Sequence, residues 1–259
     1  MKKFYFISGL PRSGNTLLSS ILNQNPNILA TGQSIVPSIF YDLMQYTQNN
    51  QVNKLYPQNE RFEIFYKDLL NNFYKEDKEK YIIQRGEWIT PINLEIIKQY
   101  CPNDLKIIIM VRDILEIIKS NLNHASNYPN YFLNRDNRTT QKEKVNYLME
   151  EDIYIRLMLN SLLKLYENKE IHNYLIVDYN DLVNDPKNTL NSIYEYLEIK
   201  KYNHNFKNIK QLKGYKDRLF GHNLHKINTK EIKKEDYIIN LDQEIIEKYK
   251  DLEFWKTSH

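Results

Sequence analysis

A short apolar segment, followed by a glycine-bounded loop and a helix, constrains the fold more than any other feature of this sequence. Residues 4–8, FYFIS, are apolar and aromatic, which is typical of a strand buried in a parallel sheet. The loop at 9–16, GLPRSGNT, has the spacing G-x-x-x-x-G-x-T, and apolar residues recur at helical spacing from 15 to 23. Such a loop directs backbone N–H groups and the positive end of the helix at a phosphate or sulfate group.

The rest of the chain repeats this alternation of strands and helices. Further strands are predicted at 81–84, 106–111 and 174–177. Helices are predicted at about 35–48, 60–75, 92–100, 114–123, 142–168 and 187–198. The alternation predicts an α/β fold in which helices flank a central parallel sheet. Since no linker or repeat interrupts the chain, we expect residues 1–259, including the Lys-rich segment after 200, to form one P-loop-like domain.

The loop at 9–16 differs from loops that bind nucleoside triphosphates. Asn15 stands where those loops have the lysine that contacts the β- and γ-phosphates. Arg12 offers a planar guanidinium to a pair of anionic oxygens, and Ser13 and Thr16 offer hydroxyl donors. Two of the chain's 6 glycines also lie in this loop. We therefore expect it to bind a nucleotide with one 5′-phosphate, the alternative being an ordinary strand–helix turn.

A second anion site is predicted at the segment VRDILEIIKS, residues 111–120. Arg112 follows the strand predicted at 106–111, and Ser120 lies two turns into the next helix. Because ligands of open α/β sheets bind at the carboxyl ends of the strands, Arg112 is expected to share an edge with the first loop. Arg112 alone would also fit a surface ion pair with Asp113. Two phosphate sites together indicate a nucleotide with two separate phosphates.

Four segments of this sequence resemble the sulfotransferases that use 3′-phosphoadenosine 5′-phosphosulfate (PAPS). GLPRSGNTLLSSIL is similar to the 5′-phosphosulfate loop of that family, and VRDILEIIKS is similar to its 3′-phosphate motif. Residues 177–199, VDYNDLVNDPKNTLNSIYEYLEI, resemble a third family segment, with Asn180 in place of the usual glutamate. FGHNLHKI at 220–227 is similar to the C-terminal loop that closes over the donor. The motif style is closest to the tyrosylprotein and bacterial branch.

The resemblance implies an enzyme that moves a sulfuryl group from PAPS to a hydroxyl or amine acceptor, with the bisphosphate PAP as product. It implies donor contacts from Pro11, Arg12, Ser13, Gly14, Asn15, Thr16, Arg112, Ser120, Tyr179, His225 and Lys226. It also implies catalytic roles for Arg12, Arg85 and Glu87, and an acceptor site containing Gln33, Ser34 and Trp88. Trp88 also fits a position in the core.

The base that deprotonates the acceptor is the point where this sequence departs from the family. In the tyrosylprotein branch a glutamate follows the glycine of the segment after the first helix, whereas this chain has Gln33 there. An amide cannot accept a proton at neutral pH, although it can orient an acceptor hydroxyl. The alternatives are Glu87, Asp42 and a histidine among His124, His222 and His225.

Composition limits the partners of this chain. A net charge of +3 is too small for a non-specific nucleic-acid binder, and no run is long and apolar enough to span a membrane. A single cysteine indicates a reducing, cytoplasmic setting, and no cluster of metal ligands is evident. The acceptor class stays open, and the sequence is compatible with a homodimer. Two other functions are considered: a non-catalytic module that binds PAPS or PAP, and a P-loop kinase of small molecules.

Overall fold

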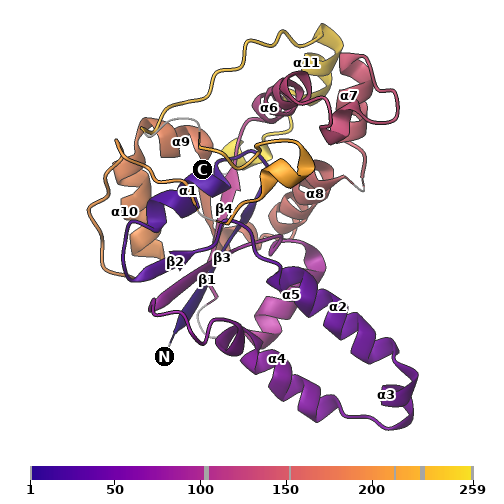
Figure 1. Cartoon of the computed structure of the whole chain (residues 1–259), viewed down its shortest axis with the longest axis vertical. Coiled ribbons are helices and arrows are strands. Elements are labelled where there is room, and N and C mark those ends of the chain that lie inside the picture. The colour runs from indigo at the N-terminus through magenta and orange to yellow at the C-terminus, as the bar shows by residue number, and fades with distance from the viewer. Residues whose placement is uncertain (1, 102–104, 152, 213, 228–230, 258–259) are drawn as a thin grey trace.

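The computed structural model describes residues 2–101, 105–151, 153–212, 214–227 and 231–257, and it is built around a five-stranded sheet (Figure 1). The strands are β1 (Lys3–Gly9), β2 (Ile28–Ala30), β3 (Tyr81–Arg85), β4 (Ile107–Val111) and β5 (Leu175–Asp178). Their order is β2-β3-β1-β4-β5, and every neighbouring pair is parallel. The predicted parallel α/β fold is confirmed, and β2 is a short strand that the sequence analysis did not predict.

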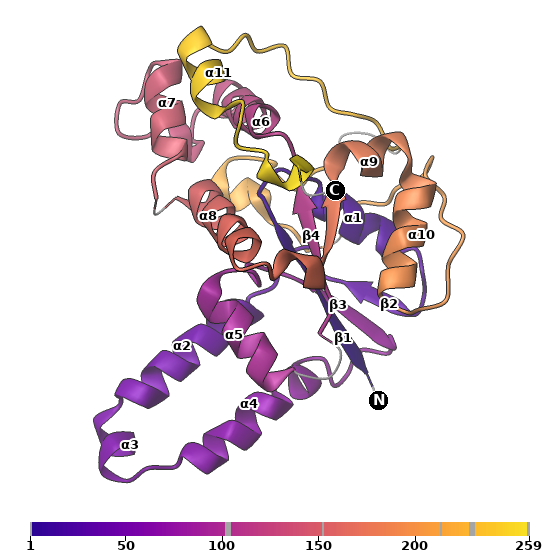
Figure 2. The ribbon, with the colours of Figure 1, turned by 180° about the vertical axis from the view of Figure 1, so that it is seen from behind.

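Helices cover both faces of this sheet (Figures 1 and 2). They are α1 (Asn15–Leu22), α2 (Val36–Asn49), α3 (Gln51–Leu55), α4 (Asn59–Phe73), α5 (Pro91–Tyr100), α6 (Ile114–Asn127), α7 (Gln141–Leu148), α8 (Tyr154–Glu167), α9 (Tyr179–Asn184), α10 (Pro186–Tyr196) and α11 (Gln243–Tyr249). Four 3₁₀ turns accompany them: η1 (Phe132–Asn134), η2 (Ile171–Asn173), η3 (Asp217–Phe220) and η4 (Phe254–Thr257).

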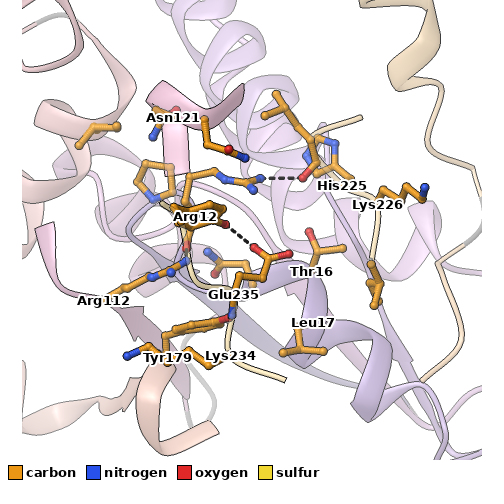
Figure 3. Close-up of a pocket in the computed structure, with 18 of the residues that line it drawn as sticks. Arg12, Thr16, Leu17, Arg112, Asn121, Tyr179, His225, Lys226, Lys234 and Glu235 are labelled. Carbon is orange, nitrogen blue, oxygen red and sulfur yellow. Dashed lines mark hydrogen bonds between the residues drawn. The ribbon is translucent and has the colours of Figure 1, made fainter. Parts of the chain in front are cut away.

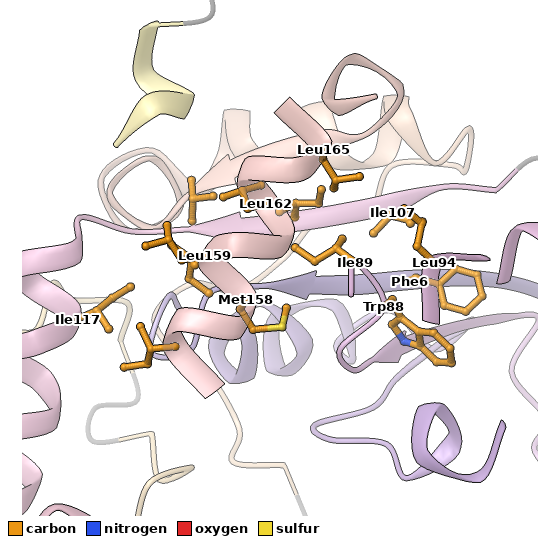
Figure 4. Packing of buried hydrophobic residues seen from close by; sticks show 14 of the residues in the cluster. Phe6, Trp88, Ile89, Leu94, Ile107, Ile117, Met158, Leu159, Leu162 and Leu165 are labelled. Carbon is orange, nitrogen blue, oxygen red and sulfur yellow. The ribbon is translucent and has the colours of Figure 1, made fainter. Parts of the chain in front are cut away.

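The side chains of β1 alternate between two hydrophobic clusters. Tyr5 and Ile7 pack with α1, α9 and α10, whereas Phe6 packs with the opposite layer, which includes α5 and α8. In that layer the apolar side of α8 lies over the sheet (Figure 4). Because both faces are covered, β1 is apolar along its length, as a buried parallel strand must be.

The helix predicted at 142–168 is wrong, because the chain forms two helices there. The first, α7, begins with a capping box at Thr140 and Glu143 and ends at Leu148. The second, α8, begins at Tyr154. The two helices pack against different neighbours, α7 against α6 and η1 and α8 against β1. A straight helix cannot reach both surfaces, so packing breaks an otherwise continuous helical pattern.

The parallel register brings the expected functional segments to one edge of the sheet. Gly9 at the end of β1 pairs with Met110 of β4, and Ile7 pairs with Arg85 at the end of β3. Val111 pairs with Asp178 at the end of β5. The segments that follow these three strands therefore emerge side by side. By contrast, α2, α3 and α4 form an arm that projects away from the sheet (Figures 1 and 2).

Candidate active site

A cavity of about 950 Å³ opens at the carboxyl edge of the sheet. The loop after β1, Arg85 and Arg112 form one side of it, and the segments at 224–227 and 231–238 form another. Apolar residues of η1, α7 and α8 line the far end, among them Phe132, Leu148 and Ile155. Figure 3 shows Arg12, Arg112 and Glu235, which come from separate parts of the chain, around the same space.

The loop after β1 has a backbone conformation suited to anions. Gly9 and Gly14 have φ values of 125° and 86°, which favour glycine, and Arg12 between them has φ 62°. At Gly9 a Cβ atom would overlap the carbonyl of Met110. The helix α1 begins directly after Gly14, so its first N–H groups lie at this loop.

Two side chains of this loop stabilise its shape. The Ser13 hydroxyl donates to the Leu10 carbonyl at 2.5 Å, and the Asn15 amide donates to the same carbonyl at 2.9 Å. Ser13 is fully buried, so the expectation that its hydroxyl donates to a phosphate is wrong for this conformation. The backbone N–H groups of Ser13 and Asn15 are then the groups through which these residues would donate hydrogen bonds to an anion. Pro11, Gly14 and Thr16, for which donor contacts are predicted, line the cavity.

The side chain of Arg12 connects the loop to α6 and to the C-terminal part of the chain. Its Nε donates to Ser120 Oγ at 3.0 Å, and its Nη1 donates to the Leu224 carbonyl at 2.6 Å. Its Nη2 lies 2.9 Å from Nε2 of His124. Burial, and then the charge of Arg12, lowers the pKa of His124 to about 4, so this imidazole is neutral at pH 7.

Arg112 is buried but incompletely hydrogen-bonded. The side chain is 2% exposed, and its Nη1 donates to the Arg12 carbonyl at 3.0 Å. Its Nε and Nη2 have no hydrogen-bond partner among the described residues, and the nearest carboxylate oxygen, on Glu116, is 3.7 Å from Nη2. The guanidinium lies 4.1 Å from the ring centroid of Tyr179. Asp113 instead caps α6, which excludes the surface ion pair considered above.

Ser120 and Arg112 share the neighbours Arg12 and Tyr237. No sequence pattern marked Tyr237 or the adjoining Glu235. The Ser120 hydroxyl donates to the Tyr237 hydroxyl at 3.1 Å, and Tyr237 in turn donates to Glu235. The ring of Tyr237 is 5.7 Å from the Arg112 guanidinium. These residues belong to an extended segment without periodicity, so no pattern marked them. A tyrosine hydroxyl and a carboxylate thus lie where the sequence analysis places a 3′-phosphate.

A second group of polar side chains lies near the end of β3. The Gln33 amide donates to Glu87 Oε1 at 3.1 Å, and Glu87 also hydrogen-bonds Tyr154. Arg85 donates to the Gly32 carbonyl and lies 3.4 Å from the Tyr215 hydroxyl. Gln33, Arg85, Glu87 and Tyr154 all line the cavity.

Two residues expected at the acceptor site lie elsewhere. Trp88 is fully buried, packs with its ring centroid 4.9 Å from that of Phe6, and donates from Nε1 to the Gln84 carbonyl (Figure 4). The expectation that it contacts an acceptor is therefore wrong. Ser34 is 8% exposed, and its hydroxyl accepts from the backbone N–H of Val36 at the start of α2. Both residues are buried and hydrogen-bond to backbone groups next to the site.

His225 and Lys226 of the C-terminal loop, for which donor contacts are predicted, line the cavity. His225 Nδ1 lies 2.8 Å from Asp217 Oδ1, and the imidazole stacks on Tyr215. Of the other proposed bases, Asp42 lies on α2, and neither Asp42 nor His222 lines the cavity. Glu87 and His225 are thus the two proposed bases that face it.

Two searches of the described part of the chain gave negative results. In those ranges, no group of three or more His, Cys, Asp or Glu side chains could hold a metal ion. Across the same residues, no helix combines the length and the apolar character needed to cross a bilayer.

Comparisons with known proteins agree with the resemblance seen in the motifs. A model described as "Sulfotransferase family" matches residues 5–203, whereas no curated protein matches the chain. The sulfotransferase domain of the Synechococcus PCC 7002 olefin synthase is 20% identical, with TM-score 0.51 over 78% of this chain and 75% of that one. A sulfotransferase from Alicyclobacillus acidocaldarius is 15% identical, with TM-score 0.51 over 79% and 84%. The sulfotransferase domain of the curacin biosynthetic pathway is 12% identical, with TM-score 0.52 over 78% and 76%. At such identities the structural likeness establishes the fold.

Proposed function

Because this chain belongs to the sulfotransferase family, we propose that it transfers a sulfuryl group from PAPS to a hydroxyl or amine acceptor. One observation carries the choice of donor: the buried Nε and Nη2 atoms of Arg112 have no hydrogen-bond partner among the described residues, and Nη2 has only the distant ion pair with Glu116. A buried guanidinium with unsatisfied N–H groups destabilises the folded protein, and an anion that accepts hydrogen bonds from these groups would remove this cost. Ser120 shares the neighbours Arg12 and Tyr237 with Arg112, so both residues suit the 3′-phosphate of PAPS.

The loop after β1 fits the other end of the donor. Its positive-φ glycines and the start of α1 offer backbone N–H groups to the 5′-phosphate, and Thr16 adds a hydroxyl. Asn15 is committed to the loop itself and supplies no charge for a γ-phosphate. Tyr179 and Lys226 line the same cavity, and the Tyr179 ring packs against the Arg112 guanidinium. The donor therefore replaces Glu235 and the Tyr237 hydroxyl at Ser120 when it binds.

The transfer step needs positive charge and a base. Charge develops on the oxygen that bridges phosphorus and sulfur as the S–O bond breaks, as in phosphoryl transfer. Arg12 and Arg85 supply the positive charge, and Arg12 leaves Ser120 to do so. Glu87 accepts the proton of the acceptor, because its carboxylate faces the cavity. Gln33 holds this carboxylate in place, which accounts for an amide where relatives in the tyrosylprotein branch carry a glutamate.

Binding of PAP tests the donor. Titration calorimetry with PAP, ADP, ATP and AMP, in EDTA, is expected to show tightest binding of PAP and no effect of the chelator. Equal affinity for PAP and AMP would contradict a 3′-phosphate site at Arg112. Affinity that needs a divalent cation would instead indicate a kinase-like donor site. Transfer of labelled sulfate from PAPS to a panel of alcohols, phenols, sugars and amines then identifies the acceptor.

A further inference from the structure

Asp217 and His225 form an acid–histidine pair in the loop that borders the first anion site. One oxygen of Asp217 lies 2.8 Å from His225 Nδ1, and the other accepts from the His225 backbone N–H at 2.8 Å. The imidazole stacks on Tyr215, with ring centroids 4.1 Å apart and planes inclined by 8°. The carboxylate and the tyrosine ring therefore fix both the position and the rotation of the imidazole.

This arrangement leaves Nε2 of His225 available to the cavity. Because Asp217 accepts a hydrogen bond, Nδ1 carries a hydrogen, and Nε2 is the atom that gains or loses a proton. No residue within the described ranges hydrogen-bonds Nε2. His225 lines the cavity together with Arg12 and Thr16. Its stacking partner Tyr215 hydrogen-bonds Thr16 and Arg85, which places the ring beside the 5′ end of the donor site.

We propose that His225, oriented by Asp217, is the catalytic acid that assists departure of PAP. This proposal rests on the proposed function, since it requires a phosphosulfate at the loop after β1. In the step, an oxygen lone pair of the acceptor forms the new S–O bond while the bond from sulfur to the bridging oxygen breaks. That electron pair stays on the bridging oxygen, which receives the proton from Nε2. The acceptor proton passes to Glu87, and both residues return to their starting states by exchange with water.

Donor binding causes His225 to take up from solvent the proton that this role requires. Burial lowers the pKa of His225, the Asp217 carboxylate opposes that shift, and the charges of Arg85 and Arg12 add to it. The free enzyme therefore holds His225 neutral at pH 7. PAPS or PAP brings negative charge beside the ring and neutralises the two arginines, so the pKa rises and a proton is taken up on binding. The groups that face the imidazole in this balance are Asp217, Tyr215, Arg12 and Arg85.

Proton uptake on binding tests this proposal without an acceptor. Calorimetry of PAP binding at pH 7 in buffers with different ionisation enthalpies gives the number of protons exchanged. We expect uptake by the wild type and a clear loss of uptake in His225→Gln and Asp217→Asn. The 5′-phosphate of PAP titrates near this pH in every variant, so the difference between variants isolates His225. His172→Gln, at the exposed turn η2, is the matched histidine control.

The rate of PAPS cleavage supplies the second readout. In the wild type, kcat should fall as pH rises through the pKa of His225 in the donor complex. His225→Gln should lose this alkaline limb and about 10²-fold in kcat, the lower end for a positioned acid, because a phosphate oxygen is already a good leaving group. Hydrolysis of PAPS by water serves as the reaction until the acceptor is known.

The possible outcomes separate the two proposals. If PAP does not bind the wild type, the proposed donor is wrong. If PAP binds with equal proton exchange in the wild type and His225→Gln, or if His225→Gln keeps the alkaline limb, the role of His225 is overturned. Thermal unfolding shows whether each variant folds. If His225→Gln does not fold, Asp217→Asn alone decides, because loss of the carboxylate charge must reduce proton uptake.

Discussion

The amide of Gln33 donates a hydrogen bond to Glu87 at 3.1 Å, although 54 residues separate the two in the chain. The motif resemblance aligns Gln33 with a glutamate of the tyrosylprotein branch, and in this structure Gln33 contacts a different carboxylate, that of Glu87. A carboxylate thus faces the acceptor end of the cavity without a glutamate at position 33. This pair leads to the first two predictions.

Glu87→Gln should abolish most of the activity and leave donor binding intact. A base contributes about 10²–10⁴-fold to the rate, and we expect a loss in that range in kcat measured by single-turnover transfer from PAPS. PAP affinity should change little, since Glu87 lies on the acceptor side of the cavity. Glu95→Gln, on the exposed side of α5, is the control. A kcat within twofold of the wild type would exclude Glu87 as the base.

Gln33→Glu should lower activity, because a second carboxylate would face Glu87. The two like charges repel by about 1 kcal/mol or more at 4 Å, and they also repel the anionic donor. We expect PAPS to bind about fivefold or more weakly and the acid limb of the pH–rate profile to move to higher pH, since the shared site retains a proton more strongly. A faster enzyme would show that Glu87 does not serve as the base.

Arg112→Ala and Ser120→Ala should weaken PAP more than AMP. Hydrogen bonds to a charged group contribute about 1.5–3 kcal/mol each, or roughly 10- to 150-fold in affinity. AMP lacks the 3′-phosphate, so its affinity is the internal control for each variant. Parallel losses for both nucleotides would mean that these side chains maintain the loop, as the bond from Arg112 to the Arg12 carbonyl also allows.

Glu235→Gln should tighten the binding of PAP. The Glu235 carboxylate, joined to Ser120 through Tyr237, lies in the space that the 3′-phosphate requires. Neutralising this charge removes a repulsion of about 1 kcal/mol, so calorimetry should show about fivefold tighter binding. Asp251→Asn, an exposed acid beyond α11, is the matched control. Weaker binding by Glu235→Gln would show that this carboxylate assists the donor and does not compete with it.

Trp88→Ala should destabilise the fold by about 3–5 kcal/mol, because the ring is fully buried against Phe6. Trp88→Phe should recover much of that loss and keep the KM for the acceptor. Chemical denaturation and acceptor kinetics measure the two effects. A folded Trp88→Phe variant with a strongly raised acceptor KM would indicate that Trp88 contacts the acceptor.

Several segments of the chain fold in ways that no local sequence pattern predicts. The break between α7 and α8 was missed because apolar residues continue at helical spacing through it, and only the different packing partners of the two helices separate them. The strand β2 was missed because it has three residues and follows a polar turn. Glu235 and Tyr237 were missed because they lie in an irregular segment, where no period links a residue to a surface. Asp217 was missed because the 3₁₀ turn η3 is too short to show a period.

Local sequence patterns predict the fold class, the loop after β1, and the position of Arg85 and Arg112 at one edge of the sheet. These features follow from local apolar patterns, from glycines at fixed spacing, and from the rule that parallel strands end together. Tertiary structure alone decided the partners of each side chain. It directed Arg12 to Ser120, Glu87 to Gln33 and Asp217 to His225, and it placed Trp88 in the core. Such pairings depend on how segments that are far apart in the sequence pack together. A local sequence pattern carries no information about which distant residues come into contact.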